Sequence, residues 1–282
     1  MSEAKYTPEE IISRLELKPV TQYQSEIIGS PLEPSVVIAG AGSGKTETMS
    51  NRVLYLVANG FVTPDQILGL TFTRKAAGEL SVRIRKRLRQ LAAHKDFKHI
   101  VSTSTSVTTY HSYAGKLLSE HAIRYGIDAD AEPLGEAAIW QIASDVVRNW
   151  SDDSYRNQSA VSTVIKDLLG LSKLMLEHQV KAEDIERIGN EVLSALAPLQ
   201  GASNGEVRDV AKAMRQRNSL LPMVETFMQR RKAAGEFSFD DQMSLAADIA
   251  QNFEDVGVLE RGKYKVVLLD EYQDTSQSQV RM

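Results

Sequence analysis

The first 112 residues alternate between short apolar runs and segments with helical spacing. The clearest apolar runs lie at residues 36–38 and 67–71, and a third run ends near Thr109. Apolar runs of this length, bounded by turn-forming residues, are typical of buried strands. Strands that alternate with helices favour parallel pairing, so we expect an α/β layer architecture in this part of the chain.

Two threonines mark helix starts in the same part of the chain. Thr7 is followed at the third position by Glu10, and Thr21 is followed at the third position by Gln24. In this arrangement the threonine hydroxyl accepts a bond from the N–H of the third residue, whose side chain bonds back to the threonine N–H. We therefore predict that helices begin directly after Thr7 and after Thr21.

From about residue 113 to residue 235 the spacing of apolar residues is helical. One series with this spacing consists of Ile139, Ile142, Val146 and Trp150. Residues spaced in this way lie on one face of a helix, and a strand-like run returns only at residues 266–269. We expect an all-helical domain over residues 113–235, inserted into an α/β domain that residues 1–112 and 236–282 form together.

Composition and charge narrow the classes of protein that fit this organisation. The 282 residues have an apolar fraction of 42%, no cysteine and a formal net charge of −4. The lack of cysteine excludes disulfides and thiol catalysis, and the acidic balance excludes nucleic-acid binding by overall charge alone. No apolar run approaches the ~20 residues of a membrane span, and the polar N-terminus is not a secretory signal. We therefore expect a cytoplasmic protein without a membrane segment.

A glycine-rich loop follows the predicted strand at residues 36–38. It consists of Ala39, Gly40, Ala41, Gly42, Ser43 and Gly44, followed by Lys45 and Thr46 at the start of a predicted helix. This order of strand, loop and helix is the P-loop arrangement. Glycines let backbone N–H groups approach phosphate oxygens, while Lys45 supplies a cation for the β- and γ-phosphates and Thr46 a hydroxyl for Mg²⁺. A glycine-rich turn with a solvated lysine is the alternative.

Two carboxylates follow the last apolar run. Asp270 and Glu271 come directly after residues 266–269. A P-loop enzyme places such a strand end opposite its phosphate loop, where Asp270 can hold Mg²⁺ and Glu271 can activate the attacking water. On its own this pair is more often a solvated strand end, but with the phosphate loop it predicts a nucleoside triphosphatase that uses ATP.

The phosphate loop and the segment Asp-Glu-Tyr-Gln-Asp-Thr at residues 270–275 together resemble two motifs of superfamily 1 helicases of the UvrD/Rep class. The resemblance implies a RecA-like P-loop NTPase domain, called 1A, with an inserted all-helical 1B subdomain. The tyrosine departs from the more frequent phenylalanine of this motif. With Thr-Arg-Lys-Ala-Ala-Gly at residues 73–78, it is similar to actinobacterial helicases, some of which are fused to a RecB-like nuclease.

Gln24 lies where this family has a glutamine that reads the edge of the adenine base. A glutamine amide offers one donor group and one acceptor group, which match N6 and N7 of adenine. Gln24 can equally close the capping arrangement with Thr21, and the two roles are compatible.

Two further segments resemble those with which the family contacts single-stranded DNA. They contain Phe72, Thr73, Arg74 and Lys75 after the second predicted strand, and Thr109, Tyr110 and His111 after the third. Aromatic rings can stack on bases, and hydroxyls and cations can reach phosphates. A basic run between Arg83 and Arg89 follows, although such a run is more often a solvated helix face.

The resemblance implies an ATP-dependent helicase that moves 3′ to 5′ on single-stranded DNA and unwinds it at duplex junctions. In this family a second RecA-like domain, which we do not find in the chain, supplies arginines to the ATP site. We therefore expect an N-terminal part that binds Mg·ATP weakly and hydrolyses little of it alone. Two alternatives remain: a P-loop ATPase of DNA repair or partner remodelling that is not a helicase, and a non-enzymatic interaction module.

Overall fold

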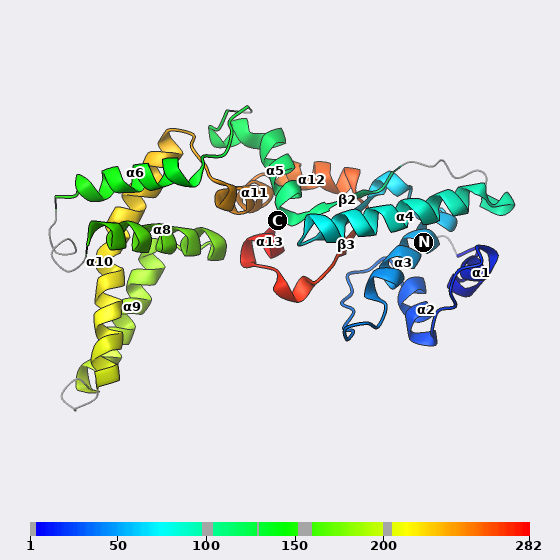
Figure 1. The fold of residues 1–282 in the computed structure, drawn as a ribbon, viewed down its shortest axis with the longest axis horizontal. Coiled ribbons are helices and arrows are strands. Elements are labelled where there is room, and N and C mark those ends of the chain that lie inside the picture. Colours follow the sequence, from blue (N-terminus) through cyan, green and yellow to red (C-terminus); the bar gives the residue numbers. More distant parts are fainter. Residues whose placement is uncertain (1–3, 98–103, 129, 152–159, 200–204) are drawn as a thin grey trace. The chain divides into compact units, whose positions relative to one another are not determined.

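The computed structural model shows two compact units (Figure 1). The first unit comprises Met1–Tyr113 and Phe253–Thr275, and the second comprises Ala114–Asn252 and Ser276–Met282. The structure describes residues 4–97, 104–128, 130–151, 160–199 and 205–282. Within these ranges, no helix combines the length and the apolar character needed to cross a bilayer.

Three helices open the first unit. These are α1 (Pro8–Arg14), α2 (Gln22–Gly29) and α3 (Lys45–Ala58). Both predicted helix starts are confirmed, because Thr7 and Thr21 each form a reciprocal capping box with the third residue of the helix that follows. The hydroxyl of each threonine satisfies a backbone N–H that has no partner inside the helix.

A three-stranded parallel sheet forms the centre of the first unit. Its strands are β1 (Ile67–Thr71), β2 (Ser106–Thr109) and β3 (Val266–Leu269), in the order β2-β1-β3. The central strand β1 is buried at every position. Because the strands are parallel, the residues that follow β1, β2 and β3 meet at one edge of the sheet.

Further helices flank these strands along the chain. The long helix α4 (Arg74–Ala93) follows β1, α5 (Tyr110–His121) follows β2, and α12 (Glu254–Lys263) precedes β3. A short 3-10 turn, Tyr272–Asp274, follows β3. The boundary between the two compact units falls within α5, after Tyr113.

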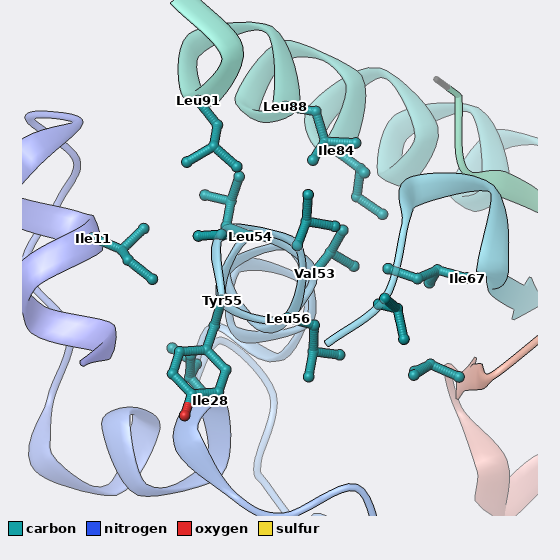
Figure 2. Packing of buried hydrophobic residues seen from close by; sticks show 14 of the residues in the cluster. Ile11, Ile28, Val53, Leu54, Tyr55, Leu56, Ile67, Ile84, Leu88 and Leu91 are labelled. Carbon is teal, nitrogen blue, oxygen red and sulfur yellow. The ribbon is translucent and has the colours of Figure 1, made fainter. Parts of the chain in front are cut away.

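The apolar core of the first unit surrounds α3. Figure 2 shows α3 end-on, with Ile11 of α1 and Ile28 of α2 on two sides and Ile84 of α4 on a third. The side chains of Val53 and Leu54, at the centre of this packing, have no exposed surface. Burial of one such side chain stabilises the fold by about 1.5–3 kcal/mol. The core therefore holds α3, the helix that starts at Lys45, firmly in place.

The prediction of a buried strand at residues 36–38 is wrong in this structure. No strand is assigned there, and the exposed fractions of Val36, Val37 and Ile38 are 76%, 47% and 96%. A strand needs a neighbouring backbone with which to pair. Among the described residues β3 pairs only with β1, and no strand lies beside residues 36–38. The apolar run thus has a suitable sequence but no partner.

The second unit is helical, as the spacing predicts. Its α-helices after α5 are α6 (Glu136–Arg148), α8 (Val161–His178), α9 (Ala182–Leu196), α10 (Gly205–Ala233), α11 (Phe239–Asn252) and α13 (Gln277–Arg281). The apolar faces of α6, α8, α9 and α10 enclose one core that includes Val147, Leu168 and Phe227. Within the described part of this unit, the only extended pairing is an isolated bridge between Leu134 and Ser238.

The compact units begin and end at other residues than the predicted domains. Helix α11 and the chain end belong to the helical unit, where the Ser278 hydroxyl donates a hydrogen bond to the Glu177 carbonyl at 2.8 Å. Helical spacing identifies an apolar face but not the core on which that face packs. The assignment of the units to a 1A domain and a 1B subdomain stays a prediction.

Candidate nucleotide site

The glycine-rich loop ends in a helix start that has no side-chain cap. Gly42 and Gly44 adopt positive φ angles of +76° and +89°, a conformation that residues with a Cβ rarely adopt. Helix α3 begins at Lys45, with Gly44 as its N-cap residue and no side-chain hydrogen bond to its first turn. The first N–H groups of a helix have no partner inside it, and the helix dipole favours an anion there. This end of α3 is therefore suited to bind a phosphate group.

Gln24 contacts this loop directly. Its Nε2 donates a hydrogen bond to the Ser43 carbonyl at 3.0 Å, while its Oε1 accepts one from the Thr21 N–H at 3.0 Å. A Cβ at Gly44 would lie 3.0 Å from the same Nε2, so this glycine also makes room for the glutamine. The capping role of Gln24 is confirmed. Its contact with adenine stays a prediction, with one amide hydrogen and one oxygen lone pair left to serve it.

The structure brings the phosphate loop and the acidic strand end together. Lys45 Nζ lies 3.7 Å from Glu271 Oε1, and both side chains are partly exposed. Glu271 itself has a φ of +50°, one of three positive values among the described non-glycine residues. Such a backbone conformation costs about 1–3 kcal/mol and is found preferentially at functional sites.

Asp270 directly follows strand β3. Its N–H donates to the Leu70 carbonyl at 3.0 Å, which continues the β1–β3 ladder by one residue. Burial raises the pKa of Asp270, and the neighbouring charge of Glu271 raises it further, against the lowering effect of the Glu271 N–H and of Lys45. A carboxylate with an uncompensated cost of ionisation gains from a nearby cation.

The donor groups fit a magnesium ion that is held mainly by a nucleotide. Among the residues that the structure describes, no cluster of three or more acidic or histidine side chains could bind a metal alone. Mg²⁺ in phosphate-transfer sites typically takes one or two protein oxygens, with water and phosphate oxygens completing its octahedron. Asp270 and Thr46, which is in the first turn of α3, provide a donor set of that kind.

The first predicted DNA segment begins α4. The Thr73 hydroxyl accepts a hydrogen bond from the Ala76 N–H at 3.1 Å and so caps the helix. Arg74 and Lys75 lie exposed in the first turn, where they are accessible to a ligand. Phe72 is half-buried, and its ring centroid lies 5.0 Å from that of Tyr110.

Of the second predicted DNA segment, the structure exposes only His111. The Thr109 hydroxyl is buried and accepts a hydrogen bond from the Ser112 N–H at 3.1 Å. Tyr110 is 2% exposed, and its ring packs on Phe72. Both residues are therefore buried, and their contact with DNA stays a prediction. Thr109 ends strand β2 and Tyr110 begins α5, where the backbone turns away from the sheet.

The hydroxyl of Tyr110 has no hydrogen-bond partner among the described residues. Burial raises the pKa of Tyr110 to about 12, and the charges of Tyr272 and Asp270 contribute to the increase. Tyr110 thus lies near the carboxylate that follows β3, although it comes from the end of β2. The ends of all three strands meet around this ring.

Sequence reasoning missed two residues that join α3, the helix after the phosphate loop, to neighbouring segments. Arg52 of α3 donates hydrogen bonds to the carbonyls of Ile28 at 2.6 Å and of Pro31 at 2.9 Å, and also to Ser30. Burial lowers its pKa. Glu47, in the first turn of α3, pairs with Arg83 and Arg87 of α4. Arg52 lies among buried positions of α3, and a basic residue at such a place indicates a polar partner nearby. Nothing in the sequence around Glu47 indicates its partners.

Comparisons with known proteins agree with the resemblance seen in the motifs. The profile of the UvrD/REP helicase N-terminal domain family matches residues 20–282. The ATP-dependent DNA helicase UvrD1 of Mycobacterium tuberculosis (strain ATCC 25618 / H37Rv) is 30% identical over 251 residues, which cover 89% of this chain and 28% of the relative. The ATP-dependent DNA helicase PcrA of Staphylococcus epidermidis (strain ATCC 35984 / DSM 28319 / BCRC 17069 / CCUG 31568 / BM 3577 / RP62A) is 24% identical over 267 residues, or 93% of this chain and 31% of the relative.

PcrA of Staphylococcus aureus (strain NCTC 8325 / PS 47) is 26% identical over 258 residues, which cover 91% of this chain and 30% of that protein. The chain therefore spans less than a third of the length of these curated relatives. The family match covers both compact units and includes the phosphate loop and the acidic strand end. The chain belongs to the UvrD/REP helicase N-terminal domain family.

Proposed function

We propose that the chain is the nucleotide-binding N-terminal part of an ATP-dependent DNA helicase that moves 3′ to 5′ on single-stranded DNA. The observation that carries the proposal is the approach of Lys45 to Glu271, at 3.7 Å, beside an uncapped helix start. It brings the cation of the phosphate loop to the acidic strand end. The relatives are named as ATP-dependent DNA helicases, and the family match supports the same activity here.

Each residue of the site has a role in this proposal. The N–H groups at the start of α3 and the Lys45 ammonium bind the β- and γ-phosphates. Thr46 and Asp270 would hold Mg²⁺, which when bound neutralises charge on the phosphate oxygens. Glu271 orients and deprotonates the water that attacks the γ-phosphate. Gln24 holds the loop through Ser43 and reads the adenine with its remaining amide groups.

The DNA track lies on residues that follow β1 and β2. Arg74 and Lys75 at the exposed start of α4 bind backbone phosphates, and His111 lines the path of the same DNA strand. Phe72 is half-buried and is available for stacking with one face of its ring. We assign the first compact unit to a RecA-like 1A domain and the helical unit to a 1B subdomain. Catalytic arginines would come from a second RecA-like domain, so we expect weak nucleotide binding and little turnover by this chain alone.

Titration of the chain with a fluorescent ATP analogue and Mg²⁺ tests the nucleotide site. We expect Lys45→Ala to abolish binding, because it removes the cation that faces the phosphates. Lys18→Ala removes an exposed lysine outside the site and should leave binding unchanged. Equal binding by the wild-type chain and a folded Lys45→Ala variant would overturn the proposal.

A non-helicase P-loop ATPase would share the nucleotide-site residues but would need no DNA track. Binding of a single-stranded oligonucleotide, measured over a series of salt concentrations, separates the two functions. A helicase should bind the oligonucleotide more weakly when Arg74 and Lys75 are both changed to alanine. The slope of affinity against salt should then fall by roughly one for each phosphate that is no longer neutralised. An unchanged salt slope in this double variant would favour the non-helicase ATPase.

A further inference from the structure

Two ion pairs that share Glu47 join the first turn of α3 to α4. Glu47 lies two positions after Lys45, and its Oε2 accepts a hydrogen bond from an Arg83 guanidinium nitrogen at 3.2 Å. Its Oε1 accepts a second bond, from Arg87. Both carboxylate oxygens of Glu47 are therefore used to join α3 to α4.

The pair between Glu47 and Arg87 is shielded from solvent. The side chain of Arg87 is 12% exposed and that of Glu47 is 30% exposed, whereas the side chain of Arg83 is 41% exposed. Two further nitrogens of Arg87 are buried without a partner among the described residues. A buried guanidinium needs a compensating charge, so Arg87 depends on Glu47 more than Arg83 does.

Helix α4 carries this attachment and the predicted DNA segment at once. Its first turn holds Arg74 and Lys75, and Arg87 lies 13 residues after Arg74, which is about 20 Å along an α-helix. Between Arg74 and the end of the helix, Ile84 and Leu88 pack into the core around α3 (Figure 2). A helix held along this length moves as one body, so a displacement of its first turn also displaces Arg87.

We propose that Glu47 is a positioning residue that couples the DNA-facing start of α4 to the phosphate loop. A change at Arg74 and Lys75 is transmitted through α4 to Arg87, and from Glu47 to the adjoining Lys45 and Thr46. This inference rests on the proposed function. It also assigns two arginines of the basic run in α4 to this attachment, because Arg83 and Arg87 pair with Glu47 and are therefore not free to bind DNA.

The test compares Glu47→Gln with two controls in the full chain. Glu79→Gln removes an exposed carboxylate from α4 itself. Ile11→Ala removes a core side chain of α1 and lowers stability without touching the ion pair. The readouts are the affinity for a fluorescent ATP analogue with Mg²⁺, without and with a saturating single-stranded oligonucleotide, and the melting temperature.

We expect Glu47→Gln to weaken nucleotide affinity about fivefold or more, the lower end of typical coupling between two sites, and to abolish any effect of the oligonucleotide on it. Both controls should keep the wild-type affinity. The charge exchange of Glu47→Arg with Arg87→Glu should recover most of the affinity. Oligonucleotide affinity measured without nucleotide should stay unchanged in Glu47→Gln.

Two outcomes would overturn this inference while leaving the proposed function intact. In the first, Glu47→Gln binds nucleotide as Glu79→Gln does. In the second, Glu47→Gln and Ile11→Ala weaken binding equally, which would mean a loss of stability only. If the wild-type chain binds no nucleotide, whereas all variants are folded, the proposed function fails and this inference fails with it.

Discussion

A buried ion pair in the helical unit, between Arg231 and Asp241, allows a direct test of how charge burial affects the stability of that unit. Asp241 Oδ2 accepts hydrogen bonds from the Ser238 hydroxyl at 2.8 Å, from the Ser238 N–H and from Arg231. The side chains of Asp241 and Arg231 are 8% and 7% exposed, and the Arg231 guanidinium lies 5.2 Å from the Phe227 ring centroid. Asp241→Ala would leave the charge of Arg231 buried without its partner.

The magnitude follows from burial, and the neighbouring residue provides a matched control. Removal of one partner from a buried pair costs about 3–5 kcal/mol, mainly because the other charge stays desolvated. Asp240 forms an ion pair with Lys173 at 2.9 Å, but their side chains are 59% and 57% exposed. Exposed pairs contribute about 0–1 kcal/mol. We therefore expect Asp241→Ala to lower the free energy of unfolding by several times more than Asp240→Ala does.

The positions of the tryptophans make this measurement specific to one unit. The chain has two tryptophans, Trp140 and Trp150, and both belong to the helical unit. Urea denaturation followed by tryptophan fluorescence therefore reports the unfolding of that unit. The free energy of unfolding is obtained by linear extrapolation to water for each variant.

A double variant separates the burial of charge from the removal of packing. Replacement of Arg231 by methionine in the Asp241→Ala background removes the unpaired charge and should recover part of the stability. The reasoning is refuted if Asp241→Ala and Asp240→Ala cost the same, within about 0.5 kcal/mol. It is also refuted if the double variant is as unstable as Asp241→Ala alone.

Two further substitutions test groups whose environment the structure makes unfavourable. Tyr110→Phe removes a buried hydroxyl without a partner among the described residues. Because an unmade buried hydrogen bond costs about 1–3 kcal/mol, calorimetry should show equal or higher stability for this variant. A clear decrease in stability would mean that the hydroxyl has a partner. Burial raises the pKa of Asp248 against the charges of Lys232 and Arg281. The folded chain therefore keeps this proton at a pH where the unfolded chain has released it. This protonation contributes its whole stabilisation below the pKa of the unfolded chain, and the contribution disappears as pH rises through the pKa of the folded chain. Asp248→Asn should flatten this dependence in urea denaturation between about pH 3 and pH 7, and identical pH profiles would contradict the shift.

The elements that depend on local signals could be predicted from the sequence. Thr7 and Thr21 cap their helices because hydroxyl, N–H and the third residue lie within one turn of the chain. The strand at residues 36–38 could not be judged in this way, because pairing depends on backbone from elsewhere in the chain. Its apolar side chains fit a strand, yet among the described residues no neighbour pairs with it.

The site could be predicted as far as motifs extend. The approach of Lys45 to Glu271 follows from two motifs that lie far apart in the sequence and that P-loop enzymes place opposite each other. The partners of Glu47 lie 36 and 40 positions away on α4, and no motif links them. A charged residue in a helix shows its spacing to others on the same helix, but not its partner on another. The burial of Tyr110 was hidden for the same reason, since it depends on segments that are distant in the sequence.

The residues that follow the strands have unfavourable backbone conformations or environments. These features indicate a functional edge of the sheet, independently of the family match. Glu271 adopts a backbone conformation that favours glycine, Asp270 is partly buried with a raised pKa, and the Tyr110 hydroxyl has no described partner. A fold selected only for stability would place glycine, an amide and phenylalanine at these positions. All three residues closely follow β2 or β3, and Glu271 lies beside Lys45. Strain and desolvation concentrated at one edge of a sheet are expected where a ligand offsets them, and a nucleotide with its cation would relieve the carboxylates.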